Sequence, residues 1–192
     1  MKKFQSGSCI GVFGLPGSGK STILDMLIGS SREIIAKISS GDIARRLSQE
    51  AEVKHMADGN LFPDENKLRD EILGLINKRR SSGAELVILD GFPRFAEQCH
   101  WLLENQLLGG DGNGCLIKIH CEPKDAIERA VSRSRDSQDS YDSIKKKIDK
   151  QMKMIDEMEQ EIFRYGLPYF TVANVSLQNA VETFAKYVGL RK

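Results

Sequence analysis

One stretch of the chain carries a complete phosphate-binding pattern. Residues 14–21 read GLPGSGKS, which matches G-x-x-x-x-G-K-[ST], and they follow a short apolar run at 9–13. The glycines let successive backbone N–H groups point at phosphate oxygens, and the following helix adds its unpaired N–H groups and positive dipole end. Lys20 supplies a cation for the β- and γ-phosphates, and the Ser21 hydroxyl is placed to ligate Mg²⁺. The pattern predicts a site for a nucleoside triphosphate with Mg²⁺.

Two further clusters each pair an aspartate with an arginine. Residues 39–45 read SSGDIAR after a second apolar run, and residues 90–94 read DGFPR after a third, with Gln98 four residues later. An aspartate after the third strand can reach the Mg²⁺ shell if the first and third strands are neighbours. Two arginines aimed at one cleft can hold a second phosphate through bidentate hydrogen bonds. Either pair alone is also consistent with a surface ion pair, but together with the phosphate loop they predict an acceptor site.

These motifs together resemble the adenylate kinase branch of the nucleoside monophosphate kinase family. GLPGSGKST is similar to the family's P-loop, SSGDIAR to its S-T-G-D-x-x-R segment, and DGFPRFAEQ to its D-G-F-P-R-x-x-x-Q segment. Weaker matches follow. GNLFPD at 59–64 resembles the end of the monophosphate-binding insertion, and Arg129 with Arg133 resembles the R-x-x-x-R pair at the start of the lid.

The resemblance implies roles for the residues that match. ATP with Mg²⁺ would occupy the P-loop, and a monophosphate would lie opposite, with its phosphate on two arginines and its base against a serine and a glutamine. The implied residues for ATP are Gly17, Ser18, Gly19, Lys20, Ser21, Thr22 and Arg129, with Ser21 and Asp90 at Mg²⁺, Asp90 acting through water. The implied acceptor residues are Ser40, Arg45, Leu61, Phe62, Gly91, Arg94 and Gln98, and the catalytic residues are Lys20, Arg94, Arg129 and Arg133.

The resemblance also implies the reaction, which is transfer of the γ-phosphoryl group of MgATP to a nucleoside monophosphate. The amide of Gln98 offers an acceptor and donors that match the N6 and N1 edge of adenine. Pyrimidine-accepting members of the family tend to carry asparagine at the position of Gln98 and alanine at that of Ser40. AMP is therefore the expected acceptor.

Departures from the family pattern keep other interpretations open. Residues 134–139 read SRDSQD where the lid usually has G-R-x-D-D, and Lys147 stands where arginine is expected. Lysine supplies a point charge rather than a planar fork. The segment from Arg45 to Gly59 is also shorter than the usual insertion. The alternatives are a kinase of the same fold for a pyrimidine monophosphate or another small acceptor, and a catalytically impaired nucleotide-binding protein. A P-loop ATPase or GTPase would need a residue that activates water, and none is marked.

Strands and helices alternate along the chain, which is typical of an α/β protein with a parallel sheet. Apolar runs without polar alternation predict strands buried on both faces at 9–13, 34–38, 86–89, 116–119 and 169–172. Helical spacing follows the P-loop and recurs at 68–76, 127–131 and 144–162. We expect one P-loop kinase domain over 1–192, a three-layer α/β/α fold with a five-stranded parallel sheet. Small mobile insertions would bind the monophosphate (about 39–68) and form the lid (about 130–142).

Composition excludes several other classes of protein. The 192 residues carry 28 Lys and Arg against 27 Asp and Glu, a net charge of +1, so bulk charge gives no support for nucleic-acid binding. No apolar run is long enough to span a membrane, and the N-terminus turns polar before a signal-peptide core develops. We expect a cytoplasmic monomer without a membrane partner. The four cysteines lack metal or disulfide spacing and are expected to be buried thiols: Cys9, Cys99, Cys115 and Cys121.

Overall fold

The predicted five-stranded parallel sheet is confirmed in the computed structural model, which describes residues 6–50, 64–109, 114–133 and 140–190. The strands are β1 (Ser8–Phe13), β2 (Ile35–Ser39), β3 (Leu86–Asp90), β4 (Gly114–His120) and β5 (Tyr169–Ala173). They lie in the order β2-β3-β1-β4-β5, and every neighbouring pair is parallel. The order places the first and third strands side by side, as the Mg²⁺ argument requires.

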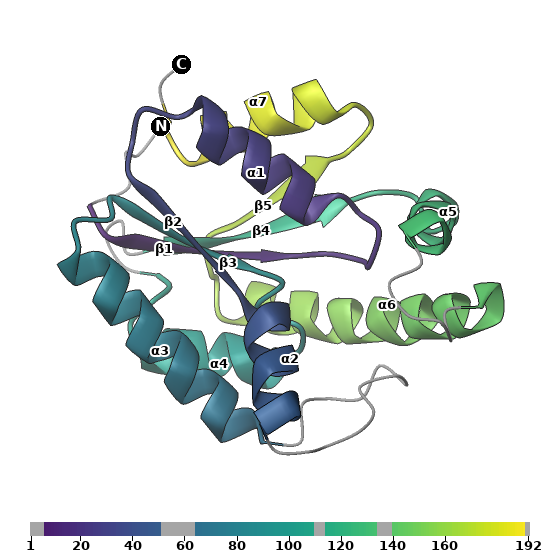
Figure 1. The fold of residues 1–192 in the computed structure, drawn as a ribbon, viewed down its shortest axis with the longest axis horizontal. Coiled ribbons are helices and arrows are strands. Elements are labelled where there is room, and N and C mark those ends of the chain that lie inside the picture. Colours follow the sequence, from purple (N-terminus) through teal and green to yellow (C-terminus); the bar gives the residue numbers. More distant parts are fainter. Residues whose placement is uncertain (1–5, 51–63, 110–113, 134–139, 191–192) are drawn as a thin grey trace.

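Seven helices within the described residues cover the sheet and its carboxyl edge (Figure 1). They are α1 (Lys20–Ser30), α2 (Ser40–Glu50), α3 (Glu65–Ser81), α4 (Ala96–Glu104), α5 (Pro123–Arg133), α6 (Tyr141–Arg164) and α7 (Leu177–Tyr187). Helices α1 and α7 lie on one face of the sheet, and α3, α4 and α6 lie on the other, which confirms the three layers (Figure 1). Helix α5 lies beyond the carboxyl ends of the strands.

Local chemistry sets where several helices begin. The side chain of Asp64 accepts a hydrogen bond from the backbone N–H of Lys67 at 3.0 Å, at the start of α3. Ser140 and Ser176 cap α6 and α7 in the same way. Such side-chain acceptors satisfy N–H groups that have no partner inside the helix. Helix α1 differs, because its N-cap residue is Gly19, which has no side chain to accept a hydrogen bond.

The core lies on both faces of the sheet. Ile10, Ile88 and Ile117 are fully buried on the face covered by α1 and α7. Val87, Leu89 and other buried side chains pack against α3, α4 and α6 on the opposite face. The central strands are therefore buried on both faces, as their continuous apolar runs predict.

The prediction that every strand is buried on both faces is wrong for the two outer strands, β2 and β5. Only Ile38 is buried in β2 and only Val172 in β5, because both strands form edges of the sheet that the helices cover incompletely. Met152, which belongs to the predicted apolar stripe of α6, is 36% exposed. Its position lies at the margin of that stripe rather than over the core.

The four cysteines are free and buried, which confirms the prediction made for them. Burial raises the pKa of the Cys9 thiol to about 12, and that of Cys99 also to about 12. No helix in the described ranges combines the length and the apolarity that crossing a membrane requires.

The burial of β3 can be tested with two isoleucines of opposite exposure. Ile88 is fully buried, whereas Ile34, just before β2, is 61% exposed. Ile88→Ala is expected to lower the free energy of unfolding by roughly 3 kcal/mol, because it leaves a cavity between the sheet and α1. Ile34→Ala should change it by less than about 0.5 kcal/mol. Urea denaturation measures both, and equal effects would contradict the assigned core.

Candidate active site

The carboxyl ends of β1, β2 and β3 lie at one level of the sheet. Asp90, the last residue of β3, pairs with Val12 of β1 on one side and with Ser39 of β2 on the other. The loop that leaves each strand therefore begins beside the others. A cavity of about 310 Å³ opens there. The predicted residues that line it are Gly17, Gly19, Lys20, Ser21, Arg45, Asp90, Gly91 and Arg94.

The P-loop is held in a conformation that two of its glycines permit. Gly17 has φ +81°, and a Cβ at this position would lie 2.1 Å from the carbonyl oxygen of Ala126 in α5. Gly19 has φ +89° and caps α1. Both values lie in the left-handed region that side chains disfavour. The loop can therefore pass close under α5 and present its N–H groups to the cavity.

The ammonium of Lys20 lies against the loop that precedes it. Its Nζ donates hydrogen bonds to the carbonyl oxygens of Gly14 and Leu15, at 2.9 and 2.8 Å. Ser18, fully buried below, offers its hydroxyl oxygen at 3.4 Å. These contacts place a cation on the cavity wall beside the N-terminus of α1, where phosphate oxygens are favoured.

Ser21 and Asp90 form the pair of oxygen ligands that a magnesium ion would use. The Ser21 hydroxyl donates to Oδ2 of Asp90 at 2.8 Å, and Asp90 is only 7% exposed. Mg²⁺ prefers hard oxygen ligands and usually binds through one or two protein oxygens, several waters and substrate phosphates. A serine hydroxyl and a carboxylate in contact beside a phosphate loop fit this donor set.

Two arginines that line the cavity converge at the start of α2. Nη2 of Arg94 and Nη1 of Arg45 lie 3.3 and 3.4 Å from the same point, where a Cβ on Gly41 would be. The Arg94 guanidinium is accessible from the cavity but surrounded by its walls, so desolvation, and next the charge of Arg45, lower its pKa. Asp90 and Glu65 oppose this shift only partly. Two neighbouring cations in a cavity make an anion site.

Other predicted acceptor residues have different surroundings. Ser40, buried at the start of α2, donates its hydroxyl to the carbonyl oxygen of Gly91 at 2.7 Å, and it joins α2 to the end of β3. Arg45 forms an ion pair with Asp42 of its own helix. Leu61 and Phe62 lie outside the described residues.

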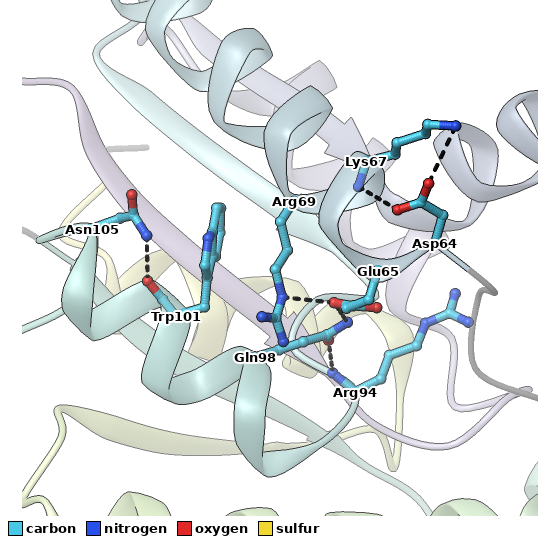
Figure 2. A network of polar contacts seen from close by, with 8 residues as sticks. All are labelled: Asp64, Glu65, Lys67, Arg69, Arg94, Gln98, Trp101 and Asn105. Carbon is cyan, nitrogen blue, oxygen red and sulfur yellow. Dashed lines mark hydrogen bonds and ion pairs between the residues drawn. The ribbon is translucent and has the colours of Figure 1, made fainter.

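Gln98 lies beneath the acceptor wall rather than on it, and is 1% exposed. Its Oε1 accepts from the backbone N–H of Arg94 at 2.7 Å, and its Nε2 donates to Oε1 of Glu65 at 2.9 Å (Figure 2). Arg69 forms an ion pair with the same Glu65 oxygen at 2.9 Å. The structure thus joins Gln98 to the acceptor arginine through the backbone.

Of the two predicted lid arginines, Arg129 is not brought to the cavity wall. Arg129 on α5 is partly exposed, lies 3.9 Å from Asp125, and does not line the cavity. Arg133 ends α5, and its side chain lies outside the described part of the chain. Thr22 is exposed in the first turn of α1 and also lies off the cavity.

Helix α6 contributes two cavity residues that the motifs do not contain, and with them Lys147, which stands where the family has arginine. Ile144, Lys147 and Gln151 line the cavity. Their spacing of three and four residues places them on one face of the helix. Gln151 also donates from Nε2 to the carbonyl oxygen of Arg94 at 3.2 Å. The helical spacing over 144–162 predicts this helix, but it does not indicate which of its side chains face the cavity.

Asn174 is a second residue that sequence reasoning missed. It follows β5, and its Nδ2 donates to the carbonyl oxygen of Ser18 at 2.7 Å. The same nitrogen lies 2.4 Å from the point where a Cβ on Gly19 would be. Its position in the sequence could have indicated it, because Asn174 follows a predicted strand directly, as the clusters at 39–45 and 90–94 do.

Comparison with known proteins agrees with this geometry. A family model described as an AAA domain (AAA_17) matches residues 13–147. The chain is 31% identical to an adenylate kinase of Helicobacter pylori over 138 residues, which cover 67% of this chain and 69% of the relative. It is 26% identical to an adenylate kinase of Nitratiruptor over 169 residues, 81% of this chain and 82% of the relative. An adenylate kinase of Dehalococcoides mccartyi is 34% identical over 125 residues, 62% and 55% of the two chains.

Because the P-loop lies close to α5 at Gly17, the addition of one methyl group there is expected to weaken ATP binding. Gly17→Ala adds a Cβ at positive φ against the carbonyl oxygen of Ala126, so the loop must shift. ATP affinity, measured by calorimetry, is expected to fall at least about tenfold. Gly29→Ala is the matched control, because a Cβ there meets nothing within 4 Å. Unchanged ATP affinity in Gly17→Ala would contradict the assigned phosphate cradle.

Proposed function

Since the chain belongs to the adenylate kinase family of P-loop nucleotide-binding proteins, we propose that it transfers the γ-phosphoryl group of MgATP to AMP and forms two molecules of ADP. One observation carries the proposal: the P-loop with Lys20 and the arginine pair Arg45 and Arg94 line the same cavity. A hydrolase needs one phosphate site and an activated water. The additional pair of cations, Arg45 and Arg94, supports the binding of a second substrate that carries a phosphate.

The donor side would bind ATP through the P-loop. N–H groups at the start of α1 would hold the β- and γ-phosphates, and Lys20 would exchange its contacts with Gly14 and Leu15 for phosphate oxygens. Mg²⁺ held by Ser21 and by Asp90 would neutralise charge on these oxygens. Thr22 belongs to the same proposed set of ATP residues.

The acceptor side would hold the phosphate of AMP on Arg45 and Arg94. Both guanidinium groups lie beside Gly41, within reach of one small anion. After its two bonds to Arg94 and Glu65, the Gln98 amide retains one N–H and one lone pair. The preference for AMP over a pyrimidine rests on the matches of Gln98 and Ser40 to the family pattern, because Gln98 is buried and does not line the cavity. Leu61 and Phe62, with Ser40, complete the acceptor set of the proposal.

Transfer requires that charge on the moving phosphoryl group be neutralised while water is excluded. Lys20 and Arg94 both line the cavity, and Lys147 from α6 adds a further cation. Arg129 and Arg133 would join them from the lid, which we place at about 130–142. The monophosphate-binding insertion we place at about 39–68. No covalent enzyme intermediate is needed, because the two substrates can react in line.

An acceptor screen tests the proposal directly. Purified protein with MgATP would be incubated with AMP, GMP, CMP or UMP, and the diphosphates formed would be measured by chromatography. ADP formation that depends on AMP is the expected result. Turnover only with CMP or UMP would contradict AMP while it retains the monophosphate kinase. ATP binding without transfer to any monophosphate would instead identify a nucleotide-binding protein without kinase activity.

Removal of the P-loop cation should nearly abolish the reaction. Lys20→Met keeps a side chain of similar length but loses the charge that faces the phosphates, and kcat is expected to fall by about 10³-fold. Lys186→Met is the matched control, because Lys186 is an exposed residue of α7 that does not line the cavity, and it should keep wild-type kcat. A coupled ADP assay gives both values. Near-normal turnover by Lys20→Met would refute the donor site.

A further inference from the structure

We propose that Glu65 is a positioning residue of the acceptor site, which acts through Gln98 to hold Arg94 in place. This inference rests on the proposed function, because it assumes that Arg94 binds the acceptor phosphate. Glu65 is the first residue of α3 and does not line the cavity. It is connected to the cavity by a relay of three polar contacts, from Arg69 through Glu65 and Gln98 to the Arg94 backbone (Figure 2).

The relay gives the Gln98 amide one orientation. Its oxygen accepts from the Arg94 N–H at 2.7 Å, and its nitrogen donates to the Glu65 carboxylate at 2.9 Å. A rotation of the amide by 180° would place the NH₂ group against the Arg94 N–H and the oxygen against the carboxylate. Both contacts would then be repulsive. Gln98 is 1% exposed, so water cannot replace the lost hydrogen bonds.

A carboxylate at position 65 performs this task because it can only accept hydrogen bonds. A neutral glutamine there could turn either its oxygen or its NH₂ group toward Gln98, so position 65 would no longer oppose the flipped orientation and only the Arg94 N–H would still do so. Arg69 is the other partner of Glu65, at 2.9 Å, and both side chains are mostly buried. This ion pair keeps an anionic oxygen beside Gln98 at the first turn of α3.

The orientation of Gln98 matters because the position of Arg94 depends on it. Nε of Arg94 donates to the carbonyl oxygen of Gly91 at 3.1 Å, and Gln151 donates to the Arg94 carbonyl oxygen at 3.2 Å. The Gln98 bond, at 2.7 Å, is the shortest of these three contacts. Loss of this acceptor would release the peptide that carries the guanidinium. The acceptor phosphate would then meet a less well ordered arginine, whereas the P-loop would be unaffected.

Two measurements on Glu65→Gln test the inference. Hydrogen exchange of the Arg94 amide, followed by NMR, reports the bond to Gln98 without any ligand and is expected to become at least about fivefold faster. The Kd for AMP should rise by about fivefold to tenfold, while the Kd for ATP stays within about twofold. Glu71→Gln is the matched control, because Glu71 lies on the same helix in an ion pair with Arg46 away from this relay. It should leave all three values as in the wild type.

A double-mutant cycle separates the relay from a general loss of structure. In a Gln98→Met background, Glu65→Gln should raise the AMP Kd no further, because its route through Gln98 is already broken. Loss of the Glu65 charge, which acts directly on the Arg94 guanidinium, would favour phosphate binding rather than weaken it. Unchanged Arg94 exchange in Glu65→Gln, an unchanged AMP Kd, additive effects in the cycle, or equal losses of AMP and ATP affinity would each overturn the inference. A wild-type protein that binds ATP but not AMP would refute the proposed acceptor instead, and Arg94 exchange would still decide whether Glu65 acts through Gln98.

Discussion

The parallel pairing of β3 with β1 on one side and with β2 on the other is the constraint on which the rest of the structure depends. Asp90 is level with Val12 and Ser39, so the loops after three different strands begin within one small volume. Ser21 and Asp90 are 69 residues apart in the chain, and this register brings the hydroxyl of one to the carboxylate of the other. The buried apolar side chains of the central strands stabilise the register, since a slip by one residue would exchange the sets of side chains that pack on the two faces of the sheet.

Charge is distributed unevenly around the cavity. Lys20, Lys147, Arg45 and Arg94 line its walls, and Asp90 is the one carboxylate among the lining residues of the described chain. The basic groups are already held by contacts with the protein. Carbonyl oxygens hold Lys20, and backbone and side-chain groups of three elements hold Arg94. Dipoles and charges that are fixed before the substrates bind need little reorganisation during reaction, which is the main source of electrostatic catalysis.

Much of this arrangement is predictable from the sequence, for identifiable reasons. The strands were predicted because continuous apolar runs mark burial on both faces, and the P-loop because its spacing is dictated by phosphate geometry. Helices α2, α4 and α7 were not predicted. The first two coincide with motifs that were interpreted for their chemistry, and in α7 the buried Ala180, Val181 and Phe184 have helical spacing that was overlooked.

Side-chain partners were harder to predict than the elements that carry them. The amide of Gln98 was expected to face a base, yet it lies between the Arg94 backbone and Glu65. Nothing in a linear pattern indicates which of two neighbouring helices supplies a hydrogen-bond partner. Contacts such as those of Gln151 and Asn174 depend on tertiary packing, which residue spacing alone does not determine.

The contact of Asn174 with the P-loop has a consequence for which parts of the chain a nucleotide cradle requires. The region that matches the family model ends at residue 147, before most of α6 and all of β5 and α7. Yet the carbonyl group of Ser18 is held by a side chain 156 residues away, and β4 has β5 as its outer neighbour. A fragment that ends at residue 147 would contain every recognisable motif but would lack the hydrogen bond from Asn174 to the P-loop. The conformation of the phosphate loop therefore depends on the complete sheet, including β5, and not on the P-loop motif alone.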